Sequence, residues 1–193
     1  LKDEEERKNA YVNYLKKTMA CVKEKYDKNT NILNIRYPSV KICTEYGCHS
    51  AALWNRNHHH EDFLFHRIGL GRMPFQAPIF IPKDQFRVQK DELALKPKDI
   101  TAAYETLKDI PVGVDFLKHS LIGIVGGKNK KGALEVARDL LIQIAANNCY
   151  TDVKTVIVYN KENSYEEEYL RCARWLPHVW SEDKKTRYTA DTM

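Results

Sequence analysis

Residues 121–134 read Leu121-Ile-Gly-Ile-Val-Gly-Gly-Lys-Asn-Lys-Lys-Gly-Ala-Leu134, and this stretch decides the predicted fold. An apolar run ends in two glycines, and an amphipathic helical pattern follows. Gly127 and Gly132 have the spacing of the two glycines in a Walker A phosphate-binding loop, G-x-x-x-x-G-K-[ST]. In such a loop the next residues are a lysine that reaches the phosphates and a Ser or Thr that holds Mg²⁺. Here they are Ala133 and Leu134, which predicts an NTPase scaffold without its charged groups.

A glycine turn between a strand and a helix also occurs in ordinary α/β folds, because the chain must turn tightly there. That interpretation stays open, although the surrounding pattern favours a relative of the P-loop proteins. Apolar residues recur at helical spacing from Ala133 to Ala145, and residues 153–158 form a second apolar, β-branched run. Strand, glycine turn, helix and strand make a βαβ unit with a right-handed crossover. We therefore predict an α/β fold with a mixed or mainly parallel sheet.

Composition sets the broad class of the protein. The 193 residues are 43% apolar and 30% charged, which is typical of a globular protein with a core of its own. No apolar run approaches the roughly 18 residues of a membrane span, and no signal peptide is visible at the charged N-terminus. Five scattered cysteines indicate a reducing compartment. A net charge of +5 is mild and argues against nucleic-acid binding.

A long helix is expected over residues 3–28, where apolar residues at three- and four-residue intervals form one stripe between charged faces. It either packs on its own domain or forms a stalk or coiled coil. The other expected elements are short strands at 32–37, 63–68, 77–81 and 111–116, a helix at 98–107, and a last helix at 164–175 with Ser164 as its N-cap.

The candidate site is the loop that leads into the predicted helix. Backbone N–H groups and the helix dipole favour an anion at a helix N-terminus, and lysines there could hold a phosphate loosely. The alternative is a solvated charged turn. The candidate phosphate-binding residues are Gly126, Gly127, Lys128, Lys130, Lys131 and Gly132. No catalytic residue is proposed from the sequence.

Two clusters of metal-ligand residue types were weighed as metal sites. His58-His-His-Glu-Asp62 lacks a spaced Cys/His partner set, and Cys43 with Cys48 and His49 lacks a second pair. We therefore expect no metal site.

Several segments resemble one family in the order in which they occur. Leu53-Trp-Asn-Arg56, Glu61-Asp-Phe-Leu64 and Arg67-Ile-Gly-Leu-Gly71 are similar to the "LWER…DFLxLRVGxG" signature of the large membrane ATPase of type VII secretion. That family is the EccC/EssC type, a relative of the FtsK/SpoIIIE motors. Further matches are Asp109-Ile-Pro-Val-Gly-Val-Asp115, Gly123-Ile-Val-Gly126, Trp175-Leu-Pro-His-Val179 and Arg187-Tyr-Thr-Ala190. The resemblance covers about residues 10–190.

The resemblance lies closest to the cytosolic domain between the membrane helices and the first FtsK-type module. It implies a degenerate P-loop, RecA-like three-layer core at residues 31–193, preceded by a membrane-proximal stalk helix at 1–30. Comparison with the FtsK-type modules places Ala133 where their P-loop lysine stands, and a register that starts at Gly126 places Gly132 there. Tyr159 and Asn160 replace the acidic residue that follows the next strand of those modules. No acidic residue ends a later predicted strand as a Walker B carboxylate would, although Asp115 closes an apolar run.

The implied function is a non-catalytic coupling or regulatory module of a type VII secretion motor, at the cytoplasmic face of a bacterial cell membrane. Its expected partners are other subunits of the secretion complex and the downstream ATPase domains of the same chain, and the full protein is expected to form homo-oligomers. ATP is the one cofactor that the loop could take, with Mg²⁺ poorly held. Two alternatives remain: a nucleotide-binding or weakly active ATPase domain, and a DNA-translocase module of the FtsK/SpoIIIE kind.

Overall fold

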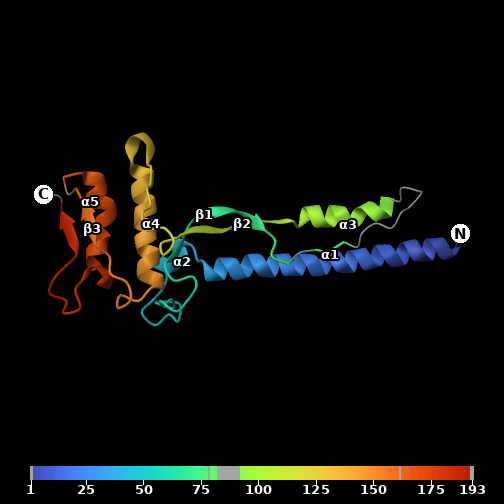
Figure 1. Cartoon of the computed structure of the whole chain (residues 1–193), viewed down its shortest axis with the longest axis horizontal. Coiled ribbons are helices and arrows are strands. Elements are labelled where there is room, and N and C mark those ends of the chain that lie inside the picture. The colour runs from blue at the N-terminus through green and yellow to red at the C-terminus, as the bar shows by residue number, and fades with distance from the viewer. Residues whose placement is uncertain (1, 78, 82–91, 161, 192–193) are drawn as a thin grey trace. The chain divides into compact units, whose positions relative to one another are not determined.

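The computed structural model describes residues 2–77, 79–81, 92–160 and 162–191 (Figure 1). The chain divides into two compact units. The first unit combines Leu1–Arg36 with Leu70–Pro111, and the second combines Tyr37–Gly69 with Val112–Met193. The described helices include none with a stretch apolar enough to cross a membrane.

The first unit is built on one long helix, α1 (Lys2–Arg36). Acidic residues in its first turn stabilise it, because they face the positive end of the helix dipole. The prediction of a helix from residue 3 is confirmed, but the predicted strand at 32–37 is wrong, since α1 continues through it. Leu33 packs against the core, and Asn34 Nδ2 donates to the carbonyl of Thr30 at 3.0 Å. Both contacts keep the last turns helical.

The core of this unit forms where Phe75, Leu107 and Ile110 meet the helix. Tyr26 of α1 packs on Phe75, with ring centroids 5.6 Å apart. Its hydroxyl donates to the carbonyl of Thr106 at 3.2 Å and accepts the N–H of Lys108 at 3.1 Å. One tyrosine therefore satisfies two backbone groups at the start of a strand while its ring fills the core.

Strands β1 (Phe65–Pro74) and β2 (Thr106–Asp115) pair with each other. The N–H of Phe75 bonds to Glu105 and that of Phe116 bonds to Leu64, so the end of β1 meets the start of β2 and the strands are antiparallel. The strands predicted at 63–68 and 111–116 are confirmed in part, since residues 65–68 belong to β1 and residues 111–115 to β2. The predicted segment 77–81 includes Pro78, outside the described residues, and its described residues form no strand.

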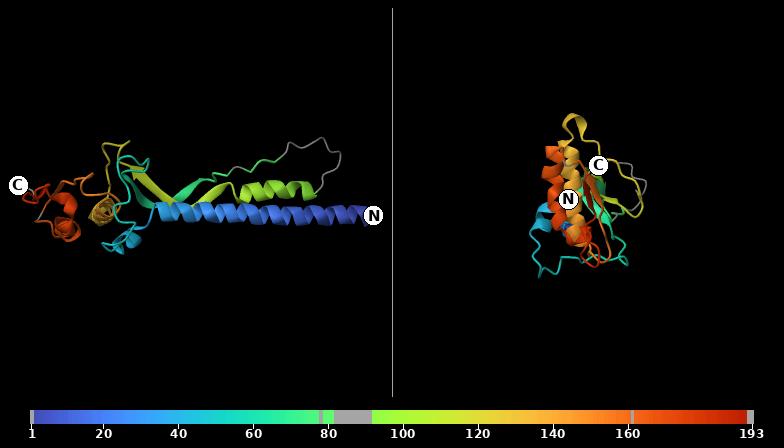
Figure 2. Two further views of the ribbon diagram at one scale, coloured as in Figure 1. Left: turned by 90° about the horizontal axis from the view of Figure 1, so that it is seen from below. Right: turned by 90° about the vertical axis from the view of Figure 1, so that its left-hand side faces the viewer.

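Helix α3 (Glu92–Ala103) contacts α1, beside which it lies in Figures 1 and 2. The helix predicted at 98–107 is therefore misplaced, and Pro97 lies inside the observed helix. Leu107 belongs instead to β2, where it is fully buried together with Ile110. Burial of these two side chains in the core outweighs the helical pattern that precedes them.

The second unit holds the predicted loop and helix. Its elements are α2 (Val40–Thr44), η1 (Gly127–Asn129), α4 (Lys131–Asn147), β3 (Ile157–Tyr159), α5 (Ser164–Leu170), η2 (Arg171–Trp175), η3 (Pro177–Val179) and β4 (Thr189–Asp191). Helices α4 and α5 contact each other and lie side by side in Figures 1 and 2. Ile157 and Tyr159 of β3 pack with Ala173 and Val179 to form the core of this unit.

The last predicted helix begins where expected but is shorter. Asn163 is its N-cap, not Ser164, since the Asn163 side chain accepts the N–H of Tyr165 at 3.1 Å. The α-helix ends at Leu170, and residues 171–175 continue as the 3₁₀ turns of η2. Of the predicted strand at 153–158, only Ile157 and Val158 are in β3.

The predicted strand at 121–125 is wrong, because these residues form no regular element. Leu121 and Val125 are 92% and 95% exposed, so this apolar run has no partner strand among the described residues. Strands β3 and β4 do pair in parallel, with Ile157 opposite Thr189 and Tyr159 opposite Asp191. A mixed helix and strand fold is confirmed, and the larger parallel sheet is not seen among the described strands.

Candidate functional site

The glycine loop that precedes α4 is compact. Gly127 has a φ of +66° and opens the short helix η1, and Lys130 has a φ of +56° at the start of α4. A Cβ on Gly126 would lie 2.8 Å from both the Cβ of Ala133 and the Cα of Lys130. Glycine is therefore required at 126 by packing and at 127 by backbone conformation.

A cavity of about 400 Å³ lies beside this loop. Three of the six candidate residues line it, namely Gly126, Gly127 and Lys130, and the other three lie in the adjacent loop and first helical turn. Ala133 also lines the cavity. Its methyl group stands where the resemblance places the lysine of an active P-loop, so the position faces the cavity but carries no charge.

Electrostatics at this cavity are mixed. No side chain of the described residues caps α4, and its first turn holds no acidic residue, which favours an anion there. However, Glu166 lines the same cavity. Its carboxylate accepts the N–H of Asn160 at 2.6 Å and the Asn163 Nδ2 at 3.0 Å. A fixed negative charge beside Lys130 weakens the attraction for a phosphate.

Asp115, the acid that closes an apolar run, stabilises the turn that follows β2. Its Oδ1 accepts the N–H groups of Leu117 and Lys118, and its Oδ2 lies 3.0 Å from Lys118 Nζ. The hydrogen bond from the Lys118 side chain lowers the pKa of Asp115. This carboxylate is thus held by its own turn.

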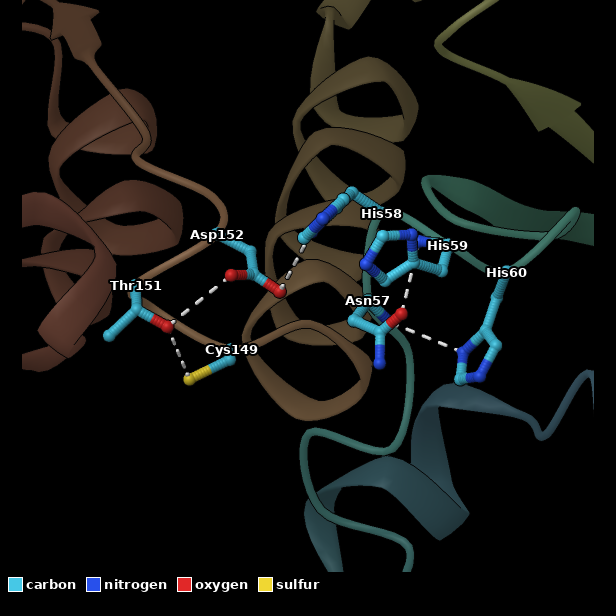
Figure 3. A network of polar contacts seen from close by, with 7 residues as sticks. All are labelled: Asn57, His58, His59, His60, Cys149, Thr151 and Asp152. Carbon is cyan, nitrogen blue, oxygen red and sulfur yellow. Dashed lines mark hydrogen bonds and ion pairs between the residues drawn. The ribbon is translucent and has the colours of Figure 1, made fainter.

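The histidines at 58–60 form part of a polar network (Figure 3). His59 donates its N–H to Asn57 Oδ1 at 3.0 Å, and His60 Nδ1 accepts the N–H of Asn57 at 3.3 Å. His58 Nδ1 lies 4.0 Å from Asp152 Oδ2. The described part of the chain contains no group of three or more His, Cys, Asp or Glu side chains placed to hold a metal ion.

A larger cavity of about 560 Å³ was not predicted from the sequence. All three tryptophans of the chain, Trp54, Trp175 and Trp180, line it together with Tyr150. The tryptophans come from two separate stretches of sequence and Tyr150 from a third, and the matches at 53–56 and 175–179 in the tryptophan stretches carry the family resemblance. The tryptophans show no helical or strand periodicity that would have indicated a shared site. We call this cavity the aromatic pocket.

The segment at 53–56 is fixed to the C-terminal end of α4. Trp54 donates its backbone N–H to Ala146 at 2.8 Å and its indole Nε1 to Ala145 at 2.9 Å, and Arg56 donates its N–H to Asn147 at 3.0 Å. The last carbonyls of a helix have no partner within the helix. These three donors satisfy them and place the Trp54 ring at the aromatic pocket.

Two buried polar side chains, one on α4 and one in the 53–56 segment, stabilise this arrangement. Gln143 is 2% exposed, and its side chain bonds to both backbone groups of Arg67, accepting the N–H at 2.8 Å and donating to the carbonyl at 2.7 Å. Arg56 is 6% exposed and donates to the Phe65 carbonyl at 2.8 Å. The residues of the resemblance at 53–67 therefore have a structural role around α4.

Two buried histidines are neutral near pH 7. Burial, with a smaller effect of Arg56, lowers the pKa of His66 to about 3. Burial also lowers the pKa of His178, whose Nε2 lies 2.8 Å from the carbonyl of Asn148. The Thr155 N–H bonds to the His178 carbonyl. His178 thus links the end of α4 to the strand that follows it.

One lysine and one backbone carbonyl contact Tyr150 and Trp180 of the aromatic pocket. Lys154 Nζ donates to the Trp180 carbonyl at 2.9 Å and lies 5.5 Å from the centroid of the Tyr150 ring. The Trp180 indole donates to the Arg174 carbonyl at 3.3 Å. Trp175 is different, because it is 81% exposed at the end of η2. Its ring is available to a binding partner.

Known proteins were compared with the chain. No protein-family model matches it. It is 28% identical over 177 residues to the ESX secretion system protein EccC of Geobacillus thermodenitrificans, and 26% identical over 179 residues to the type VII secretion system protein EssC of Staphylococcus aureus. These alignments cover 90% and 92% of the chain. The chain spans 12% of the length of these curated relatives.

Proposed function

We propose, from the premise that this chain is a segment of the EccC/EssC type, that it is a non-catalytic coupling module of a type VII secretion motor. The similarity to EccC and EssC proteins over about 90% of the chain supports the secretion role. In the longer protein the module would connect the membrane part to the downstream ATPase domains. Its partners would be those domains and other subunits of the secretion complex, at the cytoplasmic face of the membrane.

The observation that carries the non-catalytic part of the proposal is the identity of the residues at the loop cavity. Ala133 replaces the lysine that would reach the phosphates, and Leu134 replaces the hydroxyl that would hold Mg²⁺. The acid that remains at the cavity, Glu166, is engaged by Asn160 and Asn163. Positioned positive charge supplies most of the catalysis of phosphoryl transfer, so hydrolysis is not expected here.

A degenerate RecA-like core at residues 31–193 and a stalk helix at 1–30 are parts of the same proposal. The order of glycine loop, α4 and β3, with β3 in a parallel pair, supports a relative of the P-loop fold. The length of α1 supports the stalk, since a helix of 35 residues extends about 50 Å at 1.5 Å per residue.

Calorimetric titration with ATP, with and without Mg²⁺, tests the proposal. A non-catalytic module without a nucleotide site gives no saturable heat up to about 1 mM ATP, which corresponds to a binding free energy weaker than about −4 kcal/mol. It also releases no phosphate from ATP. Measurable hydrolysis would refute the proposal and revive the active-ATPase alternative.

The nucleotide-binding alternative is favoured by Lys130 at the cavity and by the uncapped start of α4. It expects saturable binding that a Lys128/Lys130/Lys131→Ala variant abolishes. A Lys16/Lys17/Lys25→Ala variant is the matched control, because it removes the same charge from α1. Binding lost only in the loop variant would make the loop a regulatory nucleotide sensor. The DNA-translocase alternative expects a salt-sensitive interaction with DNA.

A further inference from the structure

The aromatic pocket gathers all the tryptophan side chains of the chain. Three tryptophans and Tyr150 line it, and tryptophan and tyrosine are enriched among the residues that dominate binding at protein interfaces. Its volume of about 560 Å³ is within the range of ligand pockets. A binding role would explain why one of these rings, Trp175, stays 81% exposed.

Strained backbone occurs at two positions of the pocket wall. Trp54 and Lys184 have φ values of +57° and +58°, a left-handed conformation that is unfavourable for residues with a side chain. Trp54 is held by its bonds to Ala145 and Ala146. Lys184 is held in a turn by its N–H bond to Ser181 at 3.0 Å. The Trp54 ring is therefore presented in a fixed position, and the backbone of Lys184 is fixed at the wall of the pocket.

Two of the four rings have already used their hydrogen-bonding group. The indole N–H groups of Trp54 and Trp180 donate to carbonyls of the chain. These rings therefore offer apolar faces to a ligand and no hydrogen bonds. At Trp54 and Trp180 a ligand is therefore recognised by apolar contact, and charge at the edge of the pocket is the second determinant.

The charges at the edge are mainly positive. Lys154 and Lys184 line the pocket with one carboxylate, Glu182. Next to the lining residues, the Arg187 guanidinium lies 6.0 Å from the centroid of the Trp180 ring, and the Asp183 carboxylate accepts a hydrogen bond from Ser181 Oγ. Complementary charge on a partner would therefore be negative, and it would lie next to apolar groups that contact the rings.

The geometry points to a docking site for an extended, proline-containing segment of a partner protein, in which carboxylates flank the apolar residues. Proline-rich segments dock in aromatic-lined grooves because their polyproline II conformation is already formed before binding. The carboxylates would pair with Lys184 and Lys154. A nucleotide fits less well, because the described lining has no glycine loop to surround a phosphate and places Glu182 beside the lysines.

Tryptophan fluorescence of the chain tests this docking directly, because all three tryptophans line the pocket. The probe is a blocked hexapeptide of sequence DLPPLD, and its charge-reversed control is KLPPLK. Saturable quenching or a shift of emission is expected with DLPPLD, with KLPPLK binding at least about tenfold more weakly. No nucleotide is present, so the result is independent of the ATP titration.

Variants locate the binding. Trp175→Ala should weaken DLPPLD binding about tenfold or more, and it should fold normally because the residue is exposed. Lys184→Glu should reverse the preference of the pocket in favour of KLPPLK. Tyr14→Ala is the control, since it removes a ring that is 62% exposed in the first unit. Circular dichroism confirms that each variant is folded.

Three results would overturn the docking site. The first is no saturable signal with DLPPLD up to about 1 mM. The second is equal binding of the two peptides, and the third is unchanged binding of DLPPLD by Trp175→Ala. Indole N–H signals in a ¹H–¹⁵N spectrum give a second measurement. Shifts of all three indoles support docking in the pocket, and shifts confined to other residues oppose it.

Discussion

The indole Nε1 of Trp54 donates to the carbonyl of Ala145 at 2.9 Å and joins two segments that lie 91 residues apart in the sequence. The bond satisfies a carbonyl near the end of α4 and fixes the Trp54 ring beside Tyr150, with ring centroids 5.2 Å apart. The aromatic pocket thus depends on the C-terminal end of the helix whose N-terminal end forms the glycine loop.

Trp54→Phe tests how much this hydrogen bond contributes to the free energy of unfolding. Phenylalanine keeps an aromatic ring but lacks the indole N–H, so the Ala145 carbonyl loses its donor. We expect a loss of about 1 kcal/mol in the free energy of unfolding, measured by urea denaturation followed by circular dichroism. Trp175→Phe is the control and should change it by less than about 0.5 kcal/mol. Equal losses in the two variants would show that the bond does not stabilise the fold.

Gly126→Ala and Gly132→Ala should have opposite effects. A Cβ at 126 would lie 2.8 Å from Ala133 Cβ and from Lys130 Cα, so the loop must shift. We expect a loss of about 1–3 kcal/mol in unfolding free energy. At 132, in the first turn of α4, a Cβ meets no atom within 4 Å. Alanine favours helix there, and stability should rise by up to about 1 kcal/mol.

Urea denaturation of both glycine variants makes the comparison. A loss at 132 that equals the loss at 126 would mean that crowding of the loop is not the cause. ATP titration of the folded Gly126→Ala variant also shows whether the loop shape matters for any nucleotide binding.

His66 predicts how stability depends on pH. Its pKa in the folded protein is about 3, below the ordinary value of 6.5, so between these values the unfolded chain binds a proton that the folded chain does not. Stability from this group is present above about pH 6.5 and falls as the pH decreases toward 3, by at most about 1.4 kcal/mol per pH unit.

Unfolding free energies measured between pH 7 and 4 check the slope. His66→Phe should reduce it, because the ring at this position then stays neutral at every pH; His66 packs on Phe116 with ring centroids 5.8 Å apart, and phenylalanine keeps an aromatic ring there. His178, whose pKa burial also lowers, leaves part of the slope in place. His119→Gln, at an exposed position, controls for the loss of a histidine. A slope that is unchanged in His66→Phe would show that other groups cause the acid sensitivity.

Local patterns in the sequence identified the two main helices and failed where tertiary packing decides. The apolar stripes of α1 and α4 predict helices because helical spacing depends on neighbouring residues alone. The run at 121–125 has the composition of a buried strand, but a strand also needs a partner, and apolar character does not show one. Leu107 was predicted at the end of a helix, but it lies in β2 because its side chain is fully buried in the core there.

The candidate site shows the same division. The spacing of Gly127 and Gly132 predicts the loop, and the structure supplies a physical reason for glycine at 126 and at 127. The aromatic pocket could not be predicted, since Trp54 reaches it through bonds to Ala145 and Ala146 that only the folded chain brings close. The role of Gln143 was also not predicted, because the search for an apolar helix face leaves out polar residues. Its side chain bonds both backbone groups of Arg67, as a neighbouring strand would.

Substitution of Arg56 should lower the free energy of unfolding more than substitution of any other charged residue around α4. It is 6% exposed, donates to the Phe65 carbonyl at 2.8 Å, and its Nε lies 3.7 Å from Asp62 Oδ2. Arg56→Ala leaves both the carbonyl and the carboxylate without this partner, and we expect a loss of about 3–5 kcal/mol in unfolding free energy. Arg56→Lys keeps the charge but not the planar fork of donors, so its loss should be smaller.

Urea denaturation of a double-mutant cycle measures the pair. Adding Asp62→Ala to Arg56→Ala should cost less than the sum of the two single losses, because the carboxylate left by Arg56→Ala is then removed. Arg72→Ala, at an exposed position of β1, is the control and should cost less than about 0.5 kcal/mol. If Arg56→Ala costs no more than Arg72→Ala, the bonds of the buried guanidinium to Phe65 and Asp62 do not stabilise the 53–67 segment. Its stability then rests on its attachment to α4 by Trp54, by the backbone of Arg56 and by the Gln143 bonds to Arg67.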